Sequence, residues 1–302
     1  MRIKSGGGAG KGIDRGNGLT RRAVLALGMA AALVAPRVVR TAQSGPVTFG
    51  LTPVFLDSDI QLLAMLRGYL ERRLDHAVTL VKRRTYQEIT GLLLSGELDA
   101  AWICGFPLIQ YPEQLALLAV PVYHGRPLYQ SYVIVHKGNA AQSFADLRGT
   151  VHAFSDPDSN SGFLVTRHLL ATMSERPETF FRRTFFTYGH RDVIRAVSSG
   201  LADGGSVDGY VWDVVSEIEP ALTDDTRVIR KSEPLGFPPI ACNARRRPEP
   251  IVQAITDALV TMADDAGGRE LLHVLRLDGF SAEDIRLFDA IAQKYRIVQS
   301  QT

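Results

Sequence analysis

Apolar and polar positions in the first third of the chain follow a strand, helix, strand order. Short apolar runs of strand length lie at residues 47–51, 78–81 and 99–104, and the last run enters a turn at Gly105 and Pro107. Asp57-Ser58-Asp59 precedes the first helical pattern, whose apolar residues share one face: Ile60, Leu63, Leu66, Leu70 and Leu74. Tyr86 begins the second helix, which ends at Ser95-Gly96. This βαβαβ pattern predicts a parallel sheet covered by helices.

The pattern changes beyond this unit. Two extended runs, 115–123 and 129–136, follow one another without a helix between them, and the second is long enough to cross from one lobe to another. A second α/β unit begins at Ser143, with predicted strands at 150–154, 180–186 and 204–208 and predicted helices at 160–173 and 190–199. Strands at 228–230 and 240–242 are expected to return the chain toward the first α/β unit. Ser281 is predicted to cap a final helix with an apolar face of Ile285, Phe288, Ala292 and Tyr295.

These elements predict an α/β protein of two lobes, each a mixed sheet flanked by helices. Lobe 1 is expected to comprise residues 45–133 plus 238–302, and lobe 2 residues 134–237. Extended segments around 129–136 and 237–242 would join the lobes as hinges. Ligands of open α/β sheets bind beyond the carboxyl ends of strands. Cys104, the segment after Phe154 and Asp208 are therefore expected to meet in one cleft.

The first 43 residues have the features of an export signal. Thr20-Arg21-Arg22 is followed by an apolar run at 23–35, which resembles a twin-arginine signal peptide. The run is shorter than the roughly 20 residues that a membrane span needs. Cleavage is expected between Ala35 and Ser44, and the mature chain is expected in the periplasm. The alternative is a basic tail.

Removing that region changes the charge of the chain. The region holds eight of the 34 Lys and Arg and one of the 32 Asp and Glu, which leaves 26 basic and 31 acidic residues, a net charge of −5. A protein that follows nucleic-acid phosphates needs a basic face. Arg245-Arg246-Arg247 is only a short cluster before Pro248, typical of a solvated turn. Nucleic acid is therefore not an expected partner, and attraction for an anion must come from local dipoles.

Residues 154–163 contain a dense group of small polar side chains. Ser155, Ser159, Asn160 and Ser161 lie between a predicted strand and a predicted helix. The free backbone N–H groups and the dipole of a helix start attract an oxyanion. The alternative is an ordinary helix cap in an Asp-Pro turn. The excess of hydroxyl groups favours an anion site.

Six short motifs, in this order along the chain, carry a resemblance to a known family. They are Thr52-Pro53, Tyr86 at a helix start, Asp99-Ala100-Ala101-Trp102, residues 155–162, Gly189-His190 and Val207-Asp208. Together they resemble the periplasmic phosphate, phosphite and phosphonate binding proteins of ABC transporters. The resemblance covers nearly the whole mature chain. It implies the type II periplasmic binding fold, whose two lobes close on a tetrahedral oxyanion and hand it to a transporter permease. A monomer without a cofactor, a metal or an enzymatic activity is expected.

The resemblance also implies a ligand-binding set. The expected residues are Tyr86, Cys104, Ser155, Ser159, Asn160, Ser161, His190 and Asp208. Tyr86 would donate its phenol proton from the opposite lobe, and His190 would lie on the cleft wall. Asp208 would accept a proton carried by phosphate or phosphonate and thereby reject sulfate, which carries none at neutral pH. The alternatives are packing for Tyr86, a surface position for His190 and a turn for Asp208.

Cys104 departs from the pattern of this family. A thiol is a soft ligand suited to trivalent arsenic, and the chain is in this respect similar to periplasmic arsenite-sensing proteins, which signal through a sensor kinase. A buried apolar role, a ligand contact and a disulfide with Cys242 all stay open for Cys104. Cys104, His190 and Asp208 are also the residue types of a cysteine nucleophile, its base and an orienting group. No signature of such an enzyme surrounds Cys104, so a binding protein is expected.

Overall fold

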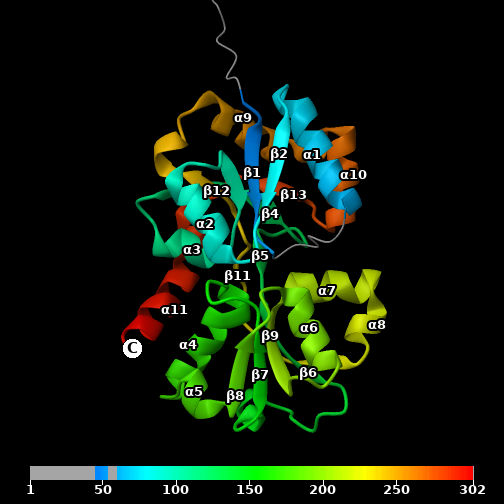
Figure 1. Ribbon diagram of the computed structural model, residues 1–302, viewed down its shortest axis with the longest axis vertical. Helices are drawn as coiled ribbons and strands as arrows, with labels where there is room; N and C mark the ends of the chain where they lie inside the picture. The colour runs from blue at the N-terminus through cyan, green and yellow to red at the C-terminus, as the bar shows by residue number, and fades with distance from the viewer. Residues whose placement is uncertain (1–44, 54–59, 302) are drawn as a thin grey trace, which may run out of the picture. The chain divides into compact units, whose positions relative to one another are not determined.

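The computed structural model describes residues 45–53 and 60–301. The export signal expected at residues 1–43 and the helix cap expected at Asp57-Ser58-Asp59 lie outside these ranges. Within them, no helix combines the length and apolar character that a membrane crossing requires. These described residues belong to one compact unit. Figure 1 shows that this unit contains two sheets, each with helices on its faces.

The first lobe is built on a six-stranded mixed sheet. Its strand order is β13 (Gly279–Ser281), β4 (Leu115–Val122), β12 (Ile240–Asn243), β3 (Ala100–Trp102), β1 (Val47–Leu51) and β2 (Val78–Lys82). β1 pairs in parallel with both β2 and β3, as the βαβαβ pattern predicts. β12 pairs antiparallel with β3 and β4, and β13 pairs antiparallel with β4. The sheet is mixed because β12 and β13 run antiparallel to their neighbours.

Helices of the first lobe cover the faces of this sheet (Figure 1). They include α1 (Ile60–Leu74), α2 (Tyr86–Ser95), α3 (Gly105–Gln110), α9 (Pro250–Val260) and α10 (Ala266–Leu275). The predicted apolar face of α1 is buried at Leu66, Leu70 and Leu74, but Ile60 is 83% exposed. Helix α2 has the predicted bounds, because a capping box at its start and left-handed Gly96 (φ 79°) at its end fix both termini.

The second lobe is built on a five-stranded mixed sheet. Its strand order is β10 (Thr226–Lys231), β6 (Ser131–His136), β9 (Gly204–Asp208), β7 (Val151–Phe154) and β8 (Arg183–Phe186). β7 runs parallel to β8 and β9, whereas β6 runs antiparallel to β9 and β10. The helices include a π-helical turn (Asn160–Leu164), α4 (Val165–Thr172), α5 (Pro177–Phe180), α6 (His190–Ser198), α7 (Gly209–Ile218) and α8 (Pro220–Thr223).

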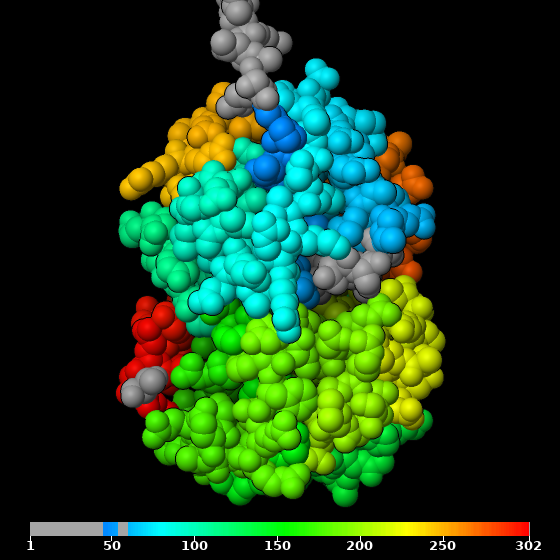
Figure 2. Space-filling model, in the orientation of Figure 1, coloured from blue at the N-terminus to red at the C-terminus, as the bar shows by residue number. Residues whose placement is uncertain are grey.

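Two crossing segments join the sheets. β5 (Leu128–Tyr129) and β11 (Leu235–Gly236) pair antiparallel as a short ribbon. β6 pairs along its whole length with β9 and β10 of the five-stranded sheet. The exact lobe boundaries, 45–133 plus 238–302 and 134–237, remain a prediction. The C-terminal helix α11 (Asp289–Gln299) contacts α4 of the second lobe. In Figure 2, α11 lies in red beside the seam where the cyan and green surfaces meet.

The chain after Cys104 differs from the sequence prediction. The turn expected at Gly105 and Pro107 is helix α3. A Cβ atom on Gly105 would lie 2.9 Å from side-chain carbons of Phe288 and Ile291. Glycine therefore lets this helix start pack directly against the C-terminal segment.

Two further predicted elements are wrong at their starts. Strand 180–186 begins only at Arg183, because Pro177 opens the short helix α5 over the preceding residues. Ser281 ends strand β13, and Asp284 instead caps a 3-10 helix that begins at Ile285. Ile285 is 47% exposed and does not belong to the buried face.

A buried polar chain inside the second lobe predicts sensitivity to acid. His152 Nε2 lies 2.9 Å from Ser206 Oγ, which lies 2.6 Å from Thr166 Oγ1. His152 Nδ1 has no partner among the described residues. Burial lowers the pKa of His152 to about 3, against about 6.5 in an unfolded chain. The unfolded chain therefore takes up this proton first as the pH falls. Stability from neutral His152 is complete above about pH 6.5 and is lost progressively toward pH 3.

We expect this one group to remove up to about 3 kcal/mol of unfolding free energy between pH 7 and pH 4. Urea denaturation of the wild type and of His152→Asn across that range measures it. The asparagine variant should be less stable at pH 7 but should show a flatter dependence on pH. Parallel pH profiles for the two proteins would show that His152 does not cause the acid sensitivity.

Candidate functional site

The structure buries all eight side chains that the sequence places in the ligand site, at 0–2% exposure. Tyr86 and Cys104 come from the first lobe, at the start of α2 and just after β3. The other six follow β7 and β9 of the second lobe or lie at the start of α6. The two groups touch across the lobes, since Tyr86 Oη lies 3.2 Å from His190 Nε2 and Asn160 N donates to Cys104 Sγ at 3.1 Å.

The segment after β7 forms a cradle around a wide first helical turn. Ser159 caps this turn, because its Oγ accepts from the N–H of Gly162 at 2.9 Å. The turn itself is π-helical, so its backbone is wider than that of an α-helix. A Cβ on Gly162 would lie 1.9 Å from Ser155 Oγ and 3.0 Å from His190 Cε1. Glycine at 162 therefore allows the Ser155 hydroxyl to approach the turn closely.

The hydrogen bonds of His190 determine where protons lie in the site. Burial lowers the pKa of His190 to about 3, so the imidazole is neutral. Its Nδ1 accepts from the N–H of Asp208 at 3.0 Å, which places the single ring proton on Nε2. Nε2–H then donates to the phenol oxygen of Tyr86. The phenol proton of Tyr86 remains for another acceptor, and burial raises the pKa of Tyr86 well above 10, so this proton is retained.

Tyr129 supplies a second phenol that the sequence did not assign to the site. Asn160 Nδ2 donates to its oxygen at 2.8 Å, so the phenol proton of Tyr129 is again left to donate elsewhere. Burial and the neighbouring Cys104 and Asp208 raise the pKa of Tyr129 well above 10. Tyr129 lies in a crossing segment, and such a segment must border any interlobe cleft. This position was the signal by which the sequence could have identified Tyr129 as a site residue.

Asp156 is a further residue that the sequence did not assign. Its Oδ2 accepts from the N–H of Tyr86 at 3.2 Å, and its Oδ1 accepts from the N–H of Asp158 at 2.8 Å. The side chain thus connects the start of α2 in the first lobe to the cradle in the second. It positions Tyr86 and does not itself offer a donor to an anion.

Three site residues carry a buried polar atom without a hydrogen-bond partner in the described part of the chain. These atoms are Ser155 Oγ, Asn160 Oδ1 and Asp208 Oδ2. An unpartnered buried polar group costs about 1–3 kcal/mol, so three in one site indicate a missing polar ligand. The other oxygen of Asp208 accepts from the N–H of Val211 at 3.3 Å. The three unpartnered atoms therefore include one carboxylate oxygen, Asp208 Oδ2, that can accept a hydrogen bond from a protonated ligand.

The electrostatic environment of the site is neutral to acidic. Burial raises the pKa of Asp208 to about 7, opposed by the N–H groups of Val211 and Tyr210 and by the Ser161 hydroxyl. Burial raises the pKa of Cys104 to about 12, so the thiol stays protonated and unreactive. Cys104 and Cys242 are free, buried thiols, which corrects the disulfide alternative. Among residues 45–53 and 60–301, no three His, Cys, Asp or Glu side chains are grouped to hold a metal.

Comparison with known proteins agrees with this geometry. Residues 49–286 match the family model described as "ABC transporter, phosphonate, periplasmic substrate-binding protein". A binding protein component of an ABC phosphonate transporter from Pseudomonas aeruginosa is 20% identical, with a TM-score of 0.77 over 85% of this chain and 87% of that one. PhnD1 from Prochlorococcus marinus, in complex with methylphosphonate, is 16% identical, with a TM-score of 0.75 over 84% of this chain and 98% of that one. The predicted two-lobed periplasmic binding fold is confirmed. The chain belongs to the family of periplasmic phosphonate-binding proteins of ABC transporters.

Proposed function

We propose that this protein captures a small phosphorus oxyanion, a phosphonate, phosphite or phosphate, between its lobes for uptake by an ABC transporter permease. The observation that carries the proposal is the convergence of orphaned polar atoms and free phenol protons in one buried site. Tyr86, Tyr129 and Ser155 each have a proton to donate, and Asp208 has a free acceptor oxygen. A tetrahedral anion that carries one proton can accept from the three donors and donate to Asp208 Oδ2.

Neutral donors are sufficient for strong binding in such a site. Each hydrogen bond to a charged acceptor contributes about 1.5–3 kcal/mol, and exclusion of water strengthens it. Micromolar affinity corresponds to about −8 kcal/mol. Four such bonds supply about 6–12 kcal/mol, and the upper end of this sum reaches the micromolar range after an association cost of about 4 kcal/mol. The site therefore needs no buried lysine or arginine.

Asp208 sets the preference among tetrahedral anions. A carboxylate beside an anion is repulsive unless a proton lies between them. Phosphate, phosphite and phosphonates carry such a proton near neutral pH, and sulfate does not. Asp208 Oδ2 accepts the proton of the former group and leaves sulfate with an unfavourable contact.

The mechanism is closure of the two lobes about the crossing segments. Tyr86 and Cys104 lie on one lobe and the cradle lies on the other, so the interlobe contacts form only when the lobes meet. An anion held by both lobes favours that closed arrangement. The closed surface then presents both lobes to the permease. No observation favours the arsenite-sensing alternative, because Cys104 is a single thiol held protonated by burial.

Tryptophan fluorescence tests this function directly. Trp102 Nε1 donates to the carbonyl of Pro238 in a crossing segment, and half-buried Trp212 lies on α7 after Asp208. Methylphosphonate, phosphite or phosphate should give a saturable change at micromolar concentration, and sulfate should not. A chain that responds to none of the three phosphorus anions does not have the proposed function.

The export route is a second part of the proposal. We expect export by the twin-arginine route because Arg21 and Arg22 directly precede the apolar run at 23–35. Replacing both by lysine should leave the uncleaved precursor in the cytoplasm and remove the mature form from a periplasmic extract. Lysine substitution of Arg37 and Arg40 is the matched control and should not block export. Equal periplasmic yield from both double variants would contradict a twin-arginine route.

A further inference from the structure

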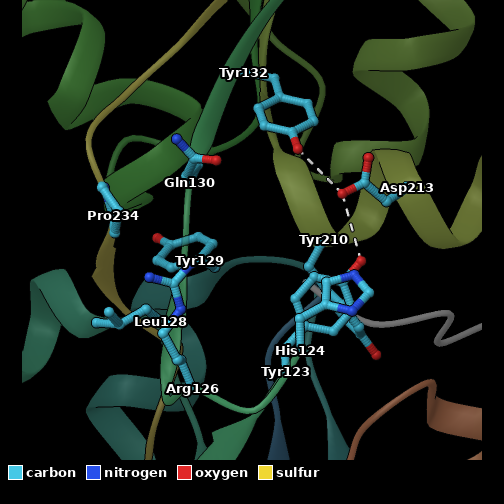
Figure 3. Close-up of a pocket in the computed structure, with 10 residues that line it drawn as sticks. All are labelled: Tyr123, His124, Arg126, Leu128, Tyr129, Gln130, Tyr132, Tyr210, Asp213 and Pro234. Atoms are coloured by element: carbon cyan, nitrogen blue, oxygen red, sulfur yellow. Dashed lines mark hydrogen bonds between the residues drawn. The ribbon is translucent and has the colours of Figure 1, made fainter.

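A cavity lies beside the crossing segments and shares Tyr129 with the oxyanion site. This hinge pocket has a volume of about 110 Å³ and is lined mainly by Tyr123, Tyr129, Tyr132, Tyr210, Arg126 and Asp213. Figure 3 shows tyrosine rings around the pocket, with Asp213 on one side and Arg126 on the other. A cavity of about 150 Å³ holds the six carbons of benzene. The hinge pocket therefore has room for about four or five non-hydrogen atoms.

Two tyrosine hydroxyls of the hinge pocket donate to the carboxylate of Asp213. Asp213 Oδ2 accepts from the hydroxyl of Tyr132 at 3.1 Å and from the hydroxyl of Tyr123 at 3.4 Å (Figure 3). Both phenol protons are thus directed to the carboxylate. The tyrosine ring surfaces and the Asp213 carboxylate attract positive charge, although Arg126, His124 and Gln130 also line the pocket.

Basic side chains also lie near the hinge pocket, and Lys231 acts on the Asp213 carboxylate. Arg126 is exposed, where solvent screens its charge, and His124 is exposed as well. Lys231 Nζ lies 4.4 Å from the ring centroid of Tyr132 and donates to its hydroxyl at 3.0 Å. The protein thus already holds one ammonium group against a tyrosine of this cluster.

We propose that the hinge pocket binds a small organic ammonium ion, through the carboxylate of Asp213 and the faces of the tyrosine rings. Aromatic walls with a nearby carboxylate are a recurring way to recognise alkylated ammonium groups. Tyr123 follows β4 of the first lobe, whereas Asp213 and Tyr132 belong to the second lobe. A bound ammonium ion therefore contacts both lobes and stabilises the arrangement in which they meet.

Thermal unfolding of the mature chain with tetramethylammonium chloride, which has five non-hydrogen atoms, tests the proposal. Sodium chloride at the same concentration controls for ionic strength. We expect a saturable rise in Tm with a midpoint of about 1–10 mM, in the range that so small a ligand allows. In Asp213→Asn the midpoint should rise at least tenfold. Asp257→Asn, on helix α9, is the control and should respond as the wild type does.

A second variant keeps the test decisive if Asp213→Asn folds poorly. Tyr132→Phe keeps the ring and removes the hydroxyl, so it should retain the response to tetramethylammonium. Tyr132→Leu removes the ring and should weaken the response at least several-fold. If tetramethylammonium chloride raises the Tm of the wild type no more than sodium chloride does, the proposal is overturned. An unchanged midpoint of the Tm rise in Asp213→Asn or in Tyr132→Leu would overturn it as well. This readout needs no oxyanion, so its failure is separate from a failure of the proposed function.

Discussion

Replacing Gly162 by alanine should lower the affinity for methylphosphonate by about 100-fold. The added Cβ would lie 1.9 Å from Ser155 Oγ and 2.8 Å from Ser155 Cβ, so Ser155 and the cradle must move apart. The shift removes the Ser155 donor and displaces the turn that Ser159 caps. Losing one or two hydrogen bonds to a charged ligand, at about 1.5–3 kcal/mol each, gives this factor. Isothermal titration calorimetry of the mature protein measures it.

A matched glycine substitution separates the site from the fold. Gly91 lies on α2, and a Cβ there would meet no atom within 4 Å. Gly91→Ala should bind with unchanged affinity and should unfold at the same or a slightly higher temperature, because alanine favours a helix. Gly162→Ala should also be less stable by about 1–3 kcal/mol, the usual cost of overpacking. Wild-type affinity in Gly162→Ala would show that the cradle does not hold the anion.

Replacing Asp208 by asparagine should change both the affinity and its dependence on pH. The amide oxygen of asparagine is a weaker acceptor than a carboxylate and does not ionise, so methylphosphonate should bind about 10- to 100-fold more weakly, the cost of losing a charge-assisted hydrogen bond. Burial raises the pKa of Asp208 to about 7, so above that pH the proton shared with the ligand must come from solvent. Wild-type affinity should therefore fall by about tenfold per pH unit well above pH 7. The asparagine variant should lose most of this slope.

The discrimination against sulfate provides the second readout for Asp208. Asparagine offers N–H donors in place of a negative charge, so Asp208→Asn should bind sulfate measurably more tightly than the wild type does. Exposed Asp225→Asn is the charge-matched control and should leave both affinity and pH dependence unchanged. Calorimetric titration of methylphosphonate and sulfate from pH 6 to pH 9 compares the three proteins. An Asp208→Asn variant that still excludes sulfate and keeps the wild-type pH slope would show that this carboxylate does not set specificity.

The sequence was informative wherever local rules determine structure. The capping of α2 and the start of α6 at His190 follow from residues close together in the chain. The prediction that the cradle and Asp208 lie near one another follows from the rule that the ends of parallel strands share a sheet edge, whereas Cys104 reaches them from the other sheet. Helix α3 was missed because its stability depends on packing of Gly105 against Phe288 and Ile291, which are distant in the chain.

The proton arrangement in the site could not be predicted from the sequence. Tyr86 and His190 are 104 residues apart, and no local pattern states that they share a hydrogen bond. The tautomer of His190 depends on the N–H of Asp208, which is in turn placed by the pairing of β9. Tyr129 and Asp156 were missed for the same reason, because their roles arise from contacts that form only in the folded chain. Ligand roles of the eight predicted residues stay a prediction until a complex is measured.

A crystal structure of the mature protein with methylphosphonate tests the central claim most directly. The account predicts phosphonate oxygens about 2.5–3.2 Å from Tyr86 Oη, Tyr129 Oη and Ser155 Oγ, with one oxygen at similar distance from Asp208 Oδ2. Methylphosphonate bound outside this set, or bound with Asp208 Oδ2 facing away from it, would contradict the account.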